Sequence, residues 1–267
     1  MDLQEMQLKY QQEGYAPLLA AAKVCQDVIL LCIASSHLKE HATIKGGVVM
    51  HSLSHDKRRA TQDIDFDFIR YPLSPEAIRS FLAEISNDEF TIVADGKIEA
   101  LKHQDYQGLR VNVRIEDKQG HSLASKLDVG VHTQLDLLQD DYCFDIDALD
   151  ENVTLLVNSR EQIFVEKMKS FLKHGFRSTR FKDVFDLYFL CQQSGLDEEK
   201  LRSCIRTLIL DDETMREDSL QSVYDRLART FQNRNFLQNF KRARKNWLDV
   251  SNEEALKGVL DYVVRLV

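Results

Sequence analysis

Three aspartates alternate with apolar residues at positions 63–68, where the chain reads Asp-Ile-Asp-Phe-Asp-Phe. Successive side chains of a strand point to opposite faces, so Asp63, Asp65 and Asp67 would share one face while the apolar residues enter a core. Neighbouring carboxylates repel one another and aspartate disfavours strands, and a bound cation would offset that cost. Mg²⁺ is commonly held by one or two carboxylates together with substrate phosphates. The pattern predicts a metal-binding strand, and a solvated edge strand with an acidic face is the alternative.

A glycine pair, Gly46-Gly47, precedes the aspartates at the end of an apolar, β-branched stretch. Two glycines after a strand let the backbone approach a ligand closely, and the N–H groups at a helix start suit phosphate. Alone, such a pair indicates an ordinary tight turn. A phosphate cradle followed by a metal-binding strand is what the handling of a nucleoside triphosphate requires. Together the two segments predict a nucleoside triphosphate site.

Several elements must position these segments. Residues 1 to about 40 have helical periodicity, with an apolar stripe that includes Leu18, Leu19 and Ile29. The most apolar stretch, residues 16–34, is interrupted by charged and polar residues and predicts a core helix, not a membrane span. Beyond it we expect a strand over 42–49, a short helix over 48–55, the acidic strand over 62–70, and a helix over 74–85 with Pro75 at its first position.

The stretch from 90 to 132 predicts a meander of strands. It offers a hairpin turn at Asp95-Gly96, a strand over 109–115, a turn at Gln119-Gly120 and a strand over 126–131. Residues 142–157 predict a linking segment with one short strand, and from Ser159 onward the pattern is helical. We therefore expect an α+β chain with a mixed α/β domain over 1–158 and a helical domain over 159–267.

The residue pattern around the glycines and aspartates resembles a known family. The run Lys-Gly-Gly, followed by Arg-x-Thr-x-Asp-Ile-Asp-Phe, is similar to the nucleotidyltransferases of the AbiEii/AbiGii toxin type, within the DNA polymerase β-like superfamily. The matching residues are Gly46, Gly47, Arg59, Thr61, Asp63 and Asp65. One departure is Val48-Val49-Met50, because members often carry a small hydroxyl residue next to the glycines.

The resemblance implies a polymerase β-like nucleotidyltransferase core, a mixed sheet with flanking helices, followed by an α-helical bundle. Asp63 and Asp65 would bind Mg²⁺, or Mn²⁺ in its place, and Gly46, Gly47, Arg59 and Thr61 would bind the nucleotide. Asp128 would be the third carboxylate, either a metal ligand or the acceptor of a proton. A lone aspartate on a strand is more often a surface residue, and that reading stays open.

Two expected helices, over 160–173 and 180–193, also match the family. The resemblance assigns Lys167 to triphosphate binding and catalysis, and Asp183 to orienting that lysine or contacting the nucleotide. Asp186 would belong to the same polar cluster. The alternative for each is a solvated helix face with ordinary ion pairs.

Composition limits the function classes. The hydrophobic share of 43%, the charged share of 29% and the net charge of −8 fit a globular protein whose RNA contacts would need a local basic patch. Two runs offer such patches, at 160–182 and at 234–245, while Phe240 and Trp247 are expected in the core. The five cysteines form no Cys-x-x-Cys pair and indicate buried thiols in a reducing cytosol.

The sequence thus predicts a cytoplasmic enzyme with a polar N-terminus, no secretory signal and no membrane contact. It would transfer a nucleoside monophosphate from an NTP to an acceptor hydroxyl. The resemblance implies that the acceptor is tRNA or another RNA, and that a cognate antitoxin protein is a partner. Two alternatives remain: a metal-dependent nuclease or phosphohydrolase that uses the acidic face, and a nucleotide-binding module without catalysis.

Overall fold

The computed structural model describes residues 2–101, 108–193 and 195–267. Part of the expected meander, residues 102–107, lies outside the described residues. The chain forms two compact units, Met1–Asn158 and Ser159–Val267.

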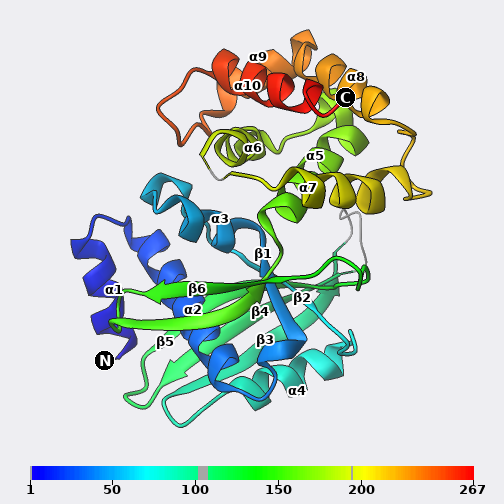
Figure 1. Ribbon diagram of the computed structural model, residues 1–267. Coiled ribbons are helices and arrows are strands. Elements are labelled where there is room, and N and C mark those ends of the chain that lie inside the picture. The colour runs from blue at the N-terminus through cyan, green and yellow to red at the C-terminus, as the bar shows by residue number, and fades with distance from the viewer. Residues whose placement is uncertain (1, 102–107, 194) are drawn as a thin grey trace. The chain divides into compact units, whose positions relative to one another are not determined.

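The first unit is built on a mixed seven-stranded sheet in the order β3-β4-β5-β2-β1-β7-β6 (Figure 1). Its strands are β1 (Ala42–Lys45), β2 (Ile64–Phe68), β3 (Phe90–Ala100), β4 (Leu109–Asp117), β5 (Ser122–Val131), β6 (Asp140–Ile146) and β7 (Glu151–Val157). The acidic strand β2 lies in the middle, antiparallel to β1 and parallel to β5. A strand hydrogen-bonded on both sides is held in a fixed register, so its side chains have fixed neighbours.

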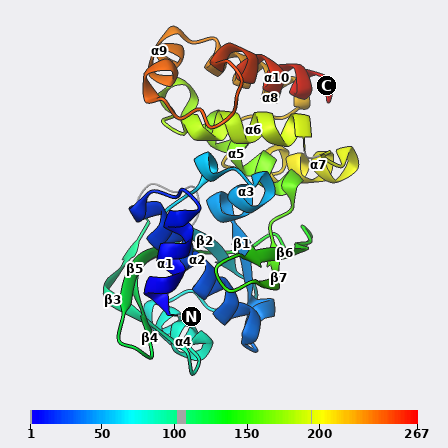
Figure 2. The ribbon, with the colours of Figure 1, turned by 90° about the vertical axis from the view of Figure 1, so that its left-hand side faces the viewer.

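Helices cover one face of this sheet. They are α1 (Leu3–Gln12), α2 (Pro17–Ser35), α3 (Gly46–Ser54) and α4 (Pro75–Ile85), with short 3₁₀ turns at Lys39–His41 and Lys57–Arg59. Helix α2 packs against β5 and β7, α4 packs against β3, and α1 lies over α2 (Figure 2). Phe66 and Phe68 of β2 contact Phe81 of α4, with ring centroids 5.6 and 4.9 Å apart. Because side chains alternate along a strand, Asp65 and Asp67 point to the opposite face.

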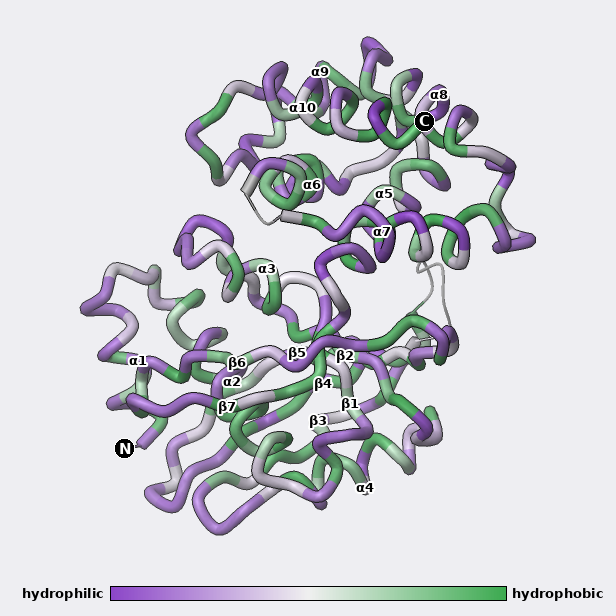
Figure 3. Tube along the Cα trace, viewed as in Figure 1, coloured by the Kyte–Doolittle hydropathy of each residue, from purple (hydrophilic) through white to green (hydrophobic). Residues whose placement is uncertain are grey.

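Helix α2 is the buried core helix that the sequence predicts. By length and composition it is apolar enough to cross a membrane, but 61% of that window is buried inside the structure. Hydrophobic residues concentrate along the strands and the packed helices, while the turns at the sheet's ends are hydrophilic (Figure 3). The expected stripe is wrong at Leu18, which is 66% exposed. Helix α4 begins as predicted, with Pro75 first and the Ser74 side chain capping it.

Three local expectations are wrong. The strand expected over 42–49 ends at Lys45, because the glycine pair already opens α3. Asp95-Gly96 is not a hairpin turn: β3 continues through it with a register shift, and the positive φ of Gly96 fits a bulge. The linking segment at 142–157 is a hairpin of two strands, β6 and β7. Its alternating buried residues were obscured by the acidic residues on its exposed side.

The second unit is helical. Its helices are α5 (Arg160–His174), α6 (Phe181–Gln193), α7 (Glu198–Ile205), α8 (Leu220–Phe231), α9 (Arg234–Ala243) and α10 (Asn252–Val264), with a 3₁₀ turn at Gly175–Arg177 and a π turn at Arg206–Leu210. Its core is rich in aromatic rings: Phe171 packs edge-on against Phe231, and Phe236 stacks on Phe240. Trp247 is 2% exposed, which confirms that it belongs to the core. The sheet and the helices confirm the α+β class.

The cysteines follow their expected burial only in part. Cys25, Cys32 and Cys204 are buried, and all five cysteines are free thiols. Burial raises the pKa of Cys25 to about 12, which keeps it protonated and unreactive. The prediction is wrong for Cys143, which is exposed because it lies on the outer side of β6.

Candidate active site

Four charged residues form a row across four adjacent strands of the first unit. Lys45 of β1 is the register partner of Asp65 of β2, and Asp65 is the register partner of Asp128 of β5. Asp128 is in turn the partner of Arg110 of β4. Residues paired in register point to the same face of a sheet. The row therefore places two carboxylates between two cations, on the face opposite Phe66 and Phe68.

The glycine pair packs closely against residues at and just before the start of β2. A Cβ atom at Gly46 would lie 2.5 Å from Oδ2 of Asp65, and Gly46 has a φ of +67°. A Cβ atom at Gly47 would lie 2.8 Å from the side chain of Thr61. Only glycine fits at these two positions, because any side chain would occupy the space of its neighbour. The structure thus brings together four residues of the sequence pattern.

Helix α3 begins at this glycine corner. Lys45 stands at the N-cap position, and its side chain makes no capping hydrogen bond to the helix. The first amides of a helix have no partner within the helix, and the helix dipole makes this end attractive to anions. The corner therefore has the donors for a phosphate group.

The three aspartates have different environments. Asp63 is exposed and precedes β2, Asp65 is half-buried, and Asp67 is buried. Lys45 donates to Oδ1 of Asp67 at 2.5 Å, and both side chains are less than a tenth exposed. The charge of Asp67 is thus balanced inside the protein. Asp63 and Asp65 are thus the two more exposed carboxylates of the expected acidic face, at the start of the strand.

Asp128 is buried at 4% exposure and holds the guanidinium of Arg110 in a two-point fork. Arg110 Nε donates to Oδ1 and Nη2 donates to Oδ2, each at 2.7 Å. The hydrogen bonds to Asp128 and the nearby charges of Asp63 and Asp65 raise the pKa of Arg110. Arg110 is not among the site residues predicted from the sequence. The sequence does contain a signal for it, because the alternation over 109–115 places Arg110 on the polar side of its strand.

Arg59 and Thr61 lie in the loop between α3 and β2. Arg59 is 3% exposed and ends the short 3₁₀ turn Lys57–Arg59. The carbonyl of Thr61 accepts a hydrogen bond of 2.8 Å from the side chain of Gln26 on α2. This bond connects the loop to the core helix, so the Thr61 side chain is held against Gly47.

In the second unit, Lys167 of α5 lies between two carboxylates of α6. Its ammonium is 2.6 Å from Asp183 and 2.8 Å from Asp186. Asp186 is fully buried and also accepts a hydrogen bond of 3.0 Å from the indole of Trp247. Arg180 lies 3.8 Å from Asp183. The three residues taken from the helical pattern thus form one polar cluster on two neighbouring helices.

The acidic face suits a divalent cation bound together with a substrate. Asp63 and Asp65 offer hard oxygen ligands, and the close approach of Gly46 to Asp65 leaves the helix amides beside them. Among the described residues, only Asp2, Asp117 and His121 bring three potential ligand atoms within 4.8 Å of one another. Those residues already cap α1 and close the β4–β5 turn. A carboxylate pair that is completed by substrate phosphates is the usual arrangement for Mg²⁺.

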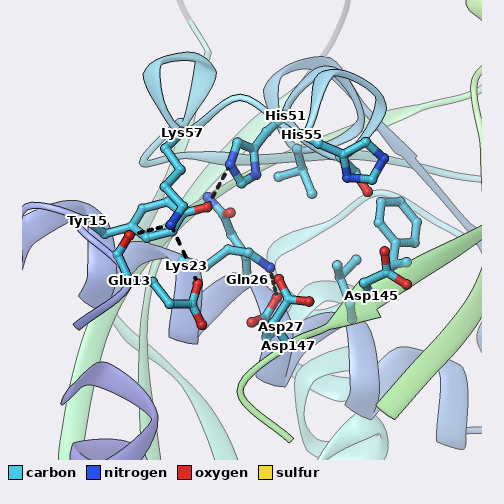
Figure 4. Close-up of a pocket in the computed structure, with 14 residues that line it drawn as sticks. Glu13, Tyr15, Lys23, Gln26, Asp27, His51, His55, Lys57, Asp145 and Asp147 are labelled. Atoms are coloured by element: carbon cyan, nitrogen blue, oxygen red, sulfur yellow. Dashed lines mark hydrogen bonds and ion pairs between the residues drawn. The ribbon is translucent and has the colours of Figure 1, made fainter. Parts of the chain in front are cut away.

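A separate polar cavity of about 190 Å³ lies at the other end of α3 (Figure 4). The charged groups that line it are largely paired with one another. Lys23 lies 2.5 Å from the buried Asp27, Lys57 lies 3.9 Å from Glu13, and the hydroxyl of Tyr15 lies 3.1 Å from His51. Burial raises the pKa of Asp27 despite its lysine partner. The cavity has none of the sequence-predicted site residues in its lining.

A glycine corner at a helix start and a carboxylate pair on the neighbouring strand are the features that the sequence pattern predicts for this site. Comparison with known families agrees. The model of the family described as "Nucleotidyl transferase AbiEii toxin, Type IV TA system" matches residues 28–255, and the chain belongs to this family. It is therefore a nucleotidyltransferase of the toxin type.

The chain is similar in structure to an antigenic nucleotidyltransferase-like protein from Paracoccidioides brasiliensis, with 15% sequence identity and a TM-score of 0.47. The similarity covers 83% of this chain and 92% of that one. A search of curated proteins found no match.

Proposed function

We propose that the protein transfers a nucleoside monophosphate from an NTP to a hydroxyl group of an RNA acceptor, with Asp63 and Asp65 as ligands of Mg²⁺. The observation that carries this proposal is the close approach of Gly46 to Asp65. It places the first amides of α3 beside a carboxylate that can bind the metal. Mg²⁺ at this pair would neutralise the triphosphate and stabilise the charge of the transfer. Mn²⁺ offers the same chemistry to the same ligands.

The chain's own groups would bind and orient the nucleotide. The amides of Gly46 and Gly47 hold the outer phosphates, and Arg59 and Thr61 support the loop that faces them. The acceptor oxygen bonds to the α-phosphorus, the bond to the bridging oxygen of the β-phosphate breaks, and pyrophosphate leaves. The proton of the hydroxyl passes to water. The family resemblance assigns Lys167 and Asp183 to the nucleotide, with Asp186 supporting the lysine.

The distribution of cations supports an RNA acceptor, and tRNA is the candidate that the resemblance implies. In the first basic run, Lys167 and Lys169 already have acidic partners, since Lys169 lies 2.5 Å from Asp212. The second run is different, because its basic residues are all exposed on α9 and the segment after it: Arg234, Lys241, Arg242, Arg244 and Lys245. Such a group of exposed cations is suited to phosphates.

The proposal also includes a protein partner and a cellular location. The family is that of a type IV toxin–antitoxin system, and a cognate antitoxin protein would restrain or reverse the activity. We place the enzyme in the cytoplasm, where its triphosphate and RNA substrates are. The free thiols of all five cysteines are consistent with a reducing compartment.

The proposal is tested by incubating the protein with each of the four α-³²P-labelled NTPs, Mg²⁺ and total bacterial tRNA. The expected result is labelled RNA that requires protein, metal and one preferred NTP. A parallel reaction without triphosphate asks whether the RNA is cut. Cleavage there would favour the nuclease, and triphosphate binding without transfer or cleavage would favour the non-catalytic module.

A further inference from the structure

The guanidinium of Arg110 is fixed in orientation by a buried carboxylate. Its fork to Asp128 uses two of the five N–H donors of a guanidinium, so three donors point elsewhere. The side chain of Arg110 is 42% exposed, whereas that of Asp128 is 4% exposed. The exposed member of the pair is the cation, and the buried carboxylate is its support. An arginine held in this way is suited to bind a phosphate at little cost in side-chain entropy.

The position of Arg110 in the sheet indicates whether it would bind a phosphate of the nucleotide or of the acceptor. Lys45, which precedes the glycine corner, and Arg110 stand at opposite ends of the four-residue row, and the exposed Glu99 of β3 is the next register partner beyond Arg110. Three strand spacings separate them, roughly 14 Å. Asp65 lies between the two ends. In phosphoryl transfer the attacking and leaving oxygens are roughly in line on opposite sides of the phosphorus. If pyrophosphate leaves at the glycine corner, the acceptor arrives from the side of Arg110.

We propose that Arg110 binds a phosphodiester of the acceptor RNA next to the attacking hydroxyl, and that Asp128 is its positioning residue. This inference rests on the proposed nucleotidyl transfer. It gives Asp128 a role different from metal ligand or proton acceptor, since the Arg110–Asp128 pair has no net charge. An RNA strand is favoured over a protein acceptor because a guanidinium fork matches phosphate geometry, and only the RNA carries a phosphate beside each hydroxyl.

The test compares three variants with the wild type in steady-state transfer from the preferred α-³²P-labelled NTP to total bacterial tRNA. Arg110→Gln removes the cation, and Arg110→Lys keeps the charge without the fork. Arg114→Gln is the matched control, because Arg114 lies on the same strand and face with a side chain 45% exposed. Because Arg110→Gln leaves a buried carboxylate without its cation, the double variant Arg110→Gln/Asp128→Asn provides a neutral pair that can fold.

The expected result is a KM for tRNA raised at least tenfold in Arg110→Gln and in the double variant, with the KM for NTP within twofold of wild type. The KM of Arg110→Lys for tRNA should lie between those of the wild type and Arg110→Gln. The KM of Arg114→Gln should equal that of the wild type. The slope of log KM for tRNA against log salt concentration should shrink by about 0.7 when one phosphate contact to a single strand is lost. A purely structural role for Arg110 would lower kcat without changing this slope.

Three outcomes would overturn the inference. One is a rise in the KM for NTP alone, another is an Arg110→Gln variant that behaves like Arg114→Gln, and the third is label found on protein instead of RNA. These differ from a failure of the proposed function. In that case the wild-type protein itself transfers no nucleotide to any acceptor, and the role of Arg110 falls with it.

Discussion

Asp65 occupies the space in which a side chain at Gly46 would begin. A Cβ atom there would lie 2.5 Å from Oδ2 of Asp65, and the φ of +67° at Gly46 adds strain for any other residue. The relationship ties the first turn of α3 to β2. It explains why a glycine and an aspartate nineteen positions apart in the sequence belong to one site.

Gly46→Ala should therefore reduce nucleotide transfer strongly. The added methyl group forces Asp65 or the helix start to move, and a misplacement of about 1 Å can reduce catalysis ~100-fold. The matched control is Gly120→Ala, because Gly120 also has a positive φ, of +85°, but no atom within 4 Å of the added Cβ. Both variants should lose about 1–2 kcal/mol of stability from backbone strain. Equal transfer rates in the two variants would contradict the importance of the Gly46–Asp65 contact.

Lys45→Met should destabilise the first unit strongly. Lys45 and Asp67 form a buried pair at 2.5 Å, and removal of one partner leaves an uncompensated charge in the core. Such a loss costs about 3–5 kcal/mol. Urea unfolding followed by circular dichroism measures it. The double variant Lys45→Met/Asp67→Leu removes both charges and should recover most of the lost stability. If the single variant is as stable as wild type, the pair is not desolvated as the structure shows.

The site is only partly readable from the sequence, for a physical reason. The alternation over 63–68 indicates which side chains share a face, and the glycine pair indicates a close approach. Neither pattern says which charges pair across strands, because register depends on long-range contacts. Lys45 and Arg110 were missed for that reason, although each stands on a strand or polar face that the sequence does indicate. The β6–β7 hairpin was missed because Asp140, Asp141 and Asp145 hid its alternating core residues.

The only tryptophan of the chain reports on the Lys167 cluster. The indole of Trp247 donates to the buried Asp186, which also pairs with Lys167. Lys167→Met leaves Asp183 and Asp186 without this ammonium and should destabilise the second unit by about 3 kcal/mol. The change should also shift the Trp247 emission. Lys257→Met is the control, because Lys257 is an exposed lysine on α10 of the same unit, and it should leave the emission unchanged. A wild-type spectrum for Lys167→Met would contradict the shared cluster.

The ion pair between Lys169 and Asp212 should contribute stability that depends on pH. Burial raises the pKa of Asp212, but hydrogen bonds from Lys169 and Thr214 outweigh it and lower the pKa to about 2. A carboxyl group with a lowered pKa stabilises the fold above its ordinary pKa of 3.8 and loses that contribution as the pH falls towards 2. Asp212→Asn should cost about 1 kcal/mol at pH 7, after allowance for solvent screening.

This contribution is measured as the difference in unfolding free energy between wild type and Asp212→Asn at several pH values. The difference should be constant from pH 7 to pH 5 and should shrink below pH 4. A difference that grows as the pH falls would have the wrong sign for a lowered pKa. It would show that Lys169 does not hold Asp212 ionised.

In the proposed function, Asp63 and Asp65 hold the metal that serves nucleotide transfer. The most direct measurement is transfer of α-³²P label to total bacterial tRNA by Asp63→Asn, Asp65→Asn and the control Asp95→Asn, an exposed aspartate of β3 in the same sheet. We expect the first two variants to fold normally and to lose at least ~1000-fold in rate, while the control keeps wild-type transfer. Full transfer by Asp65→Asn would contradict this role of Asp65.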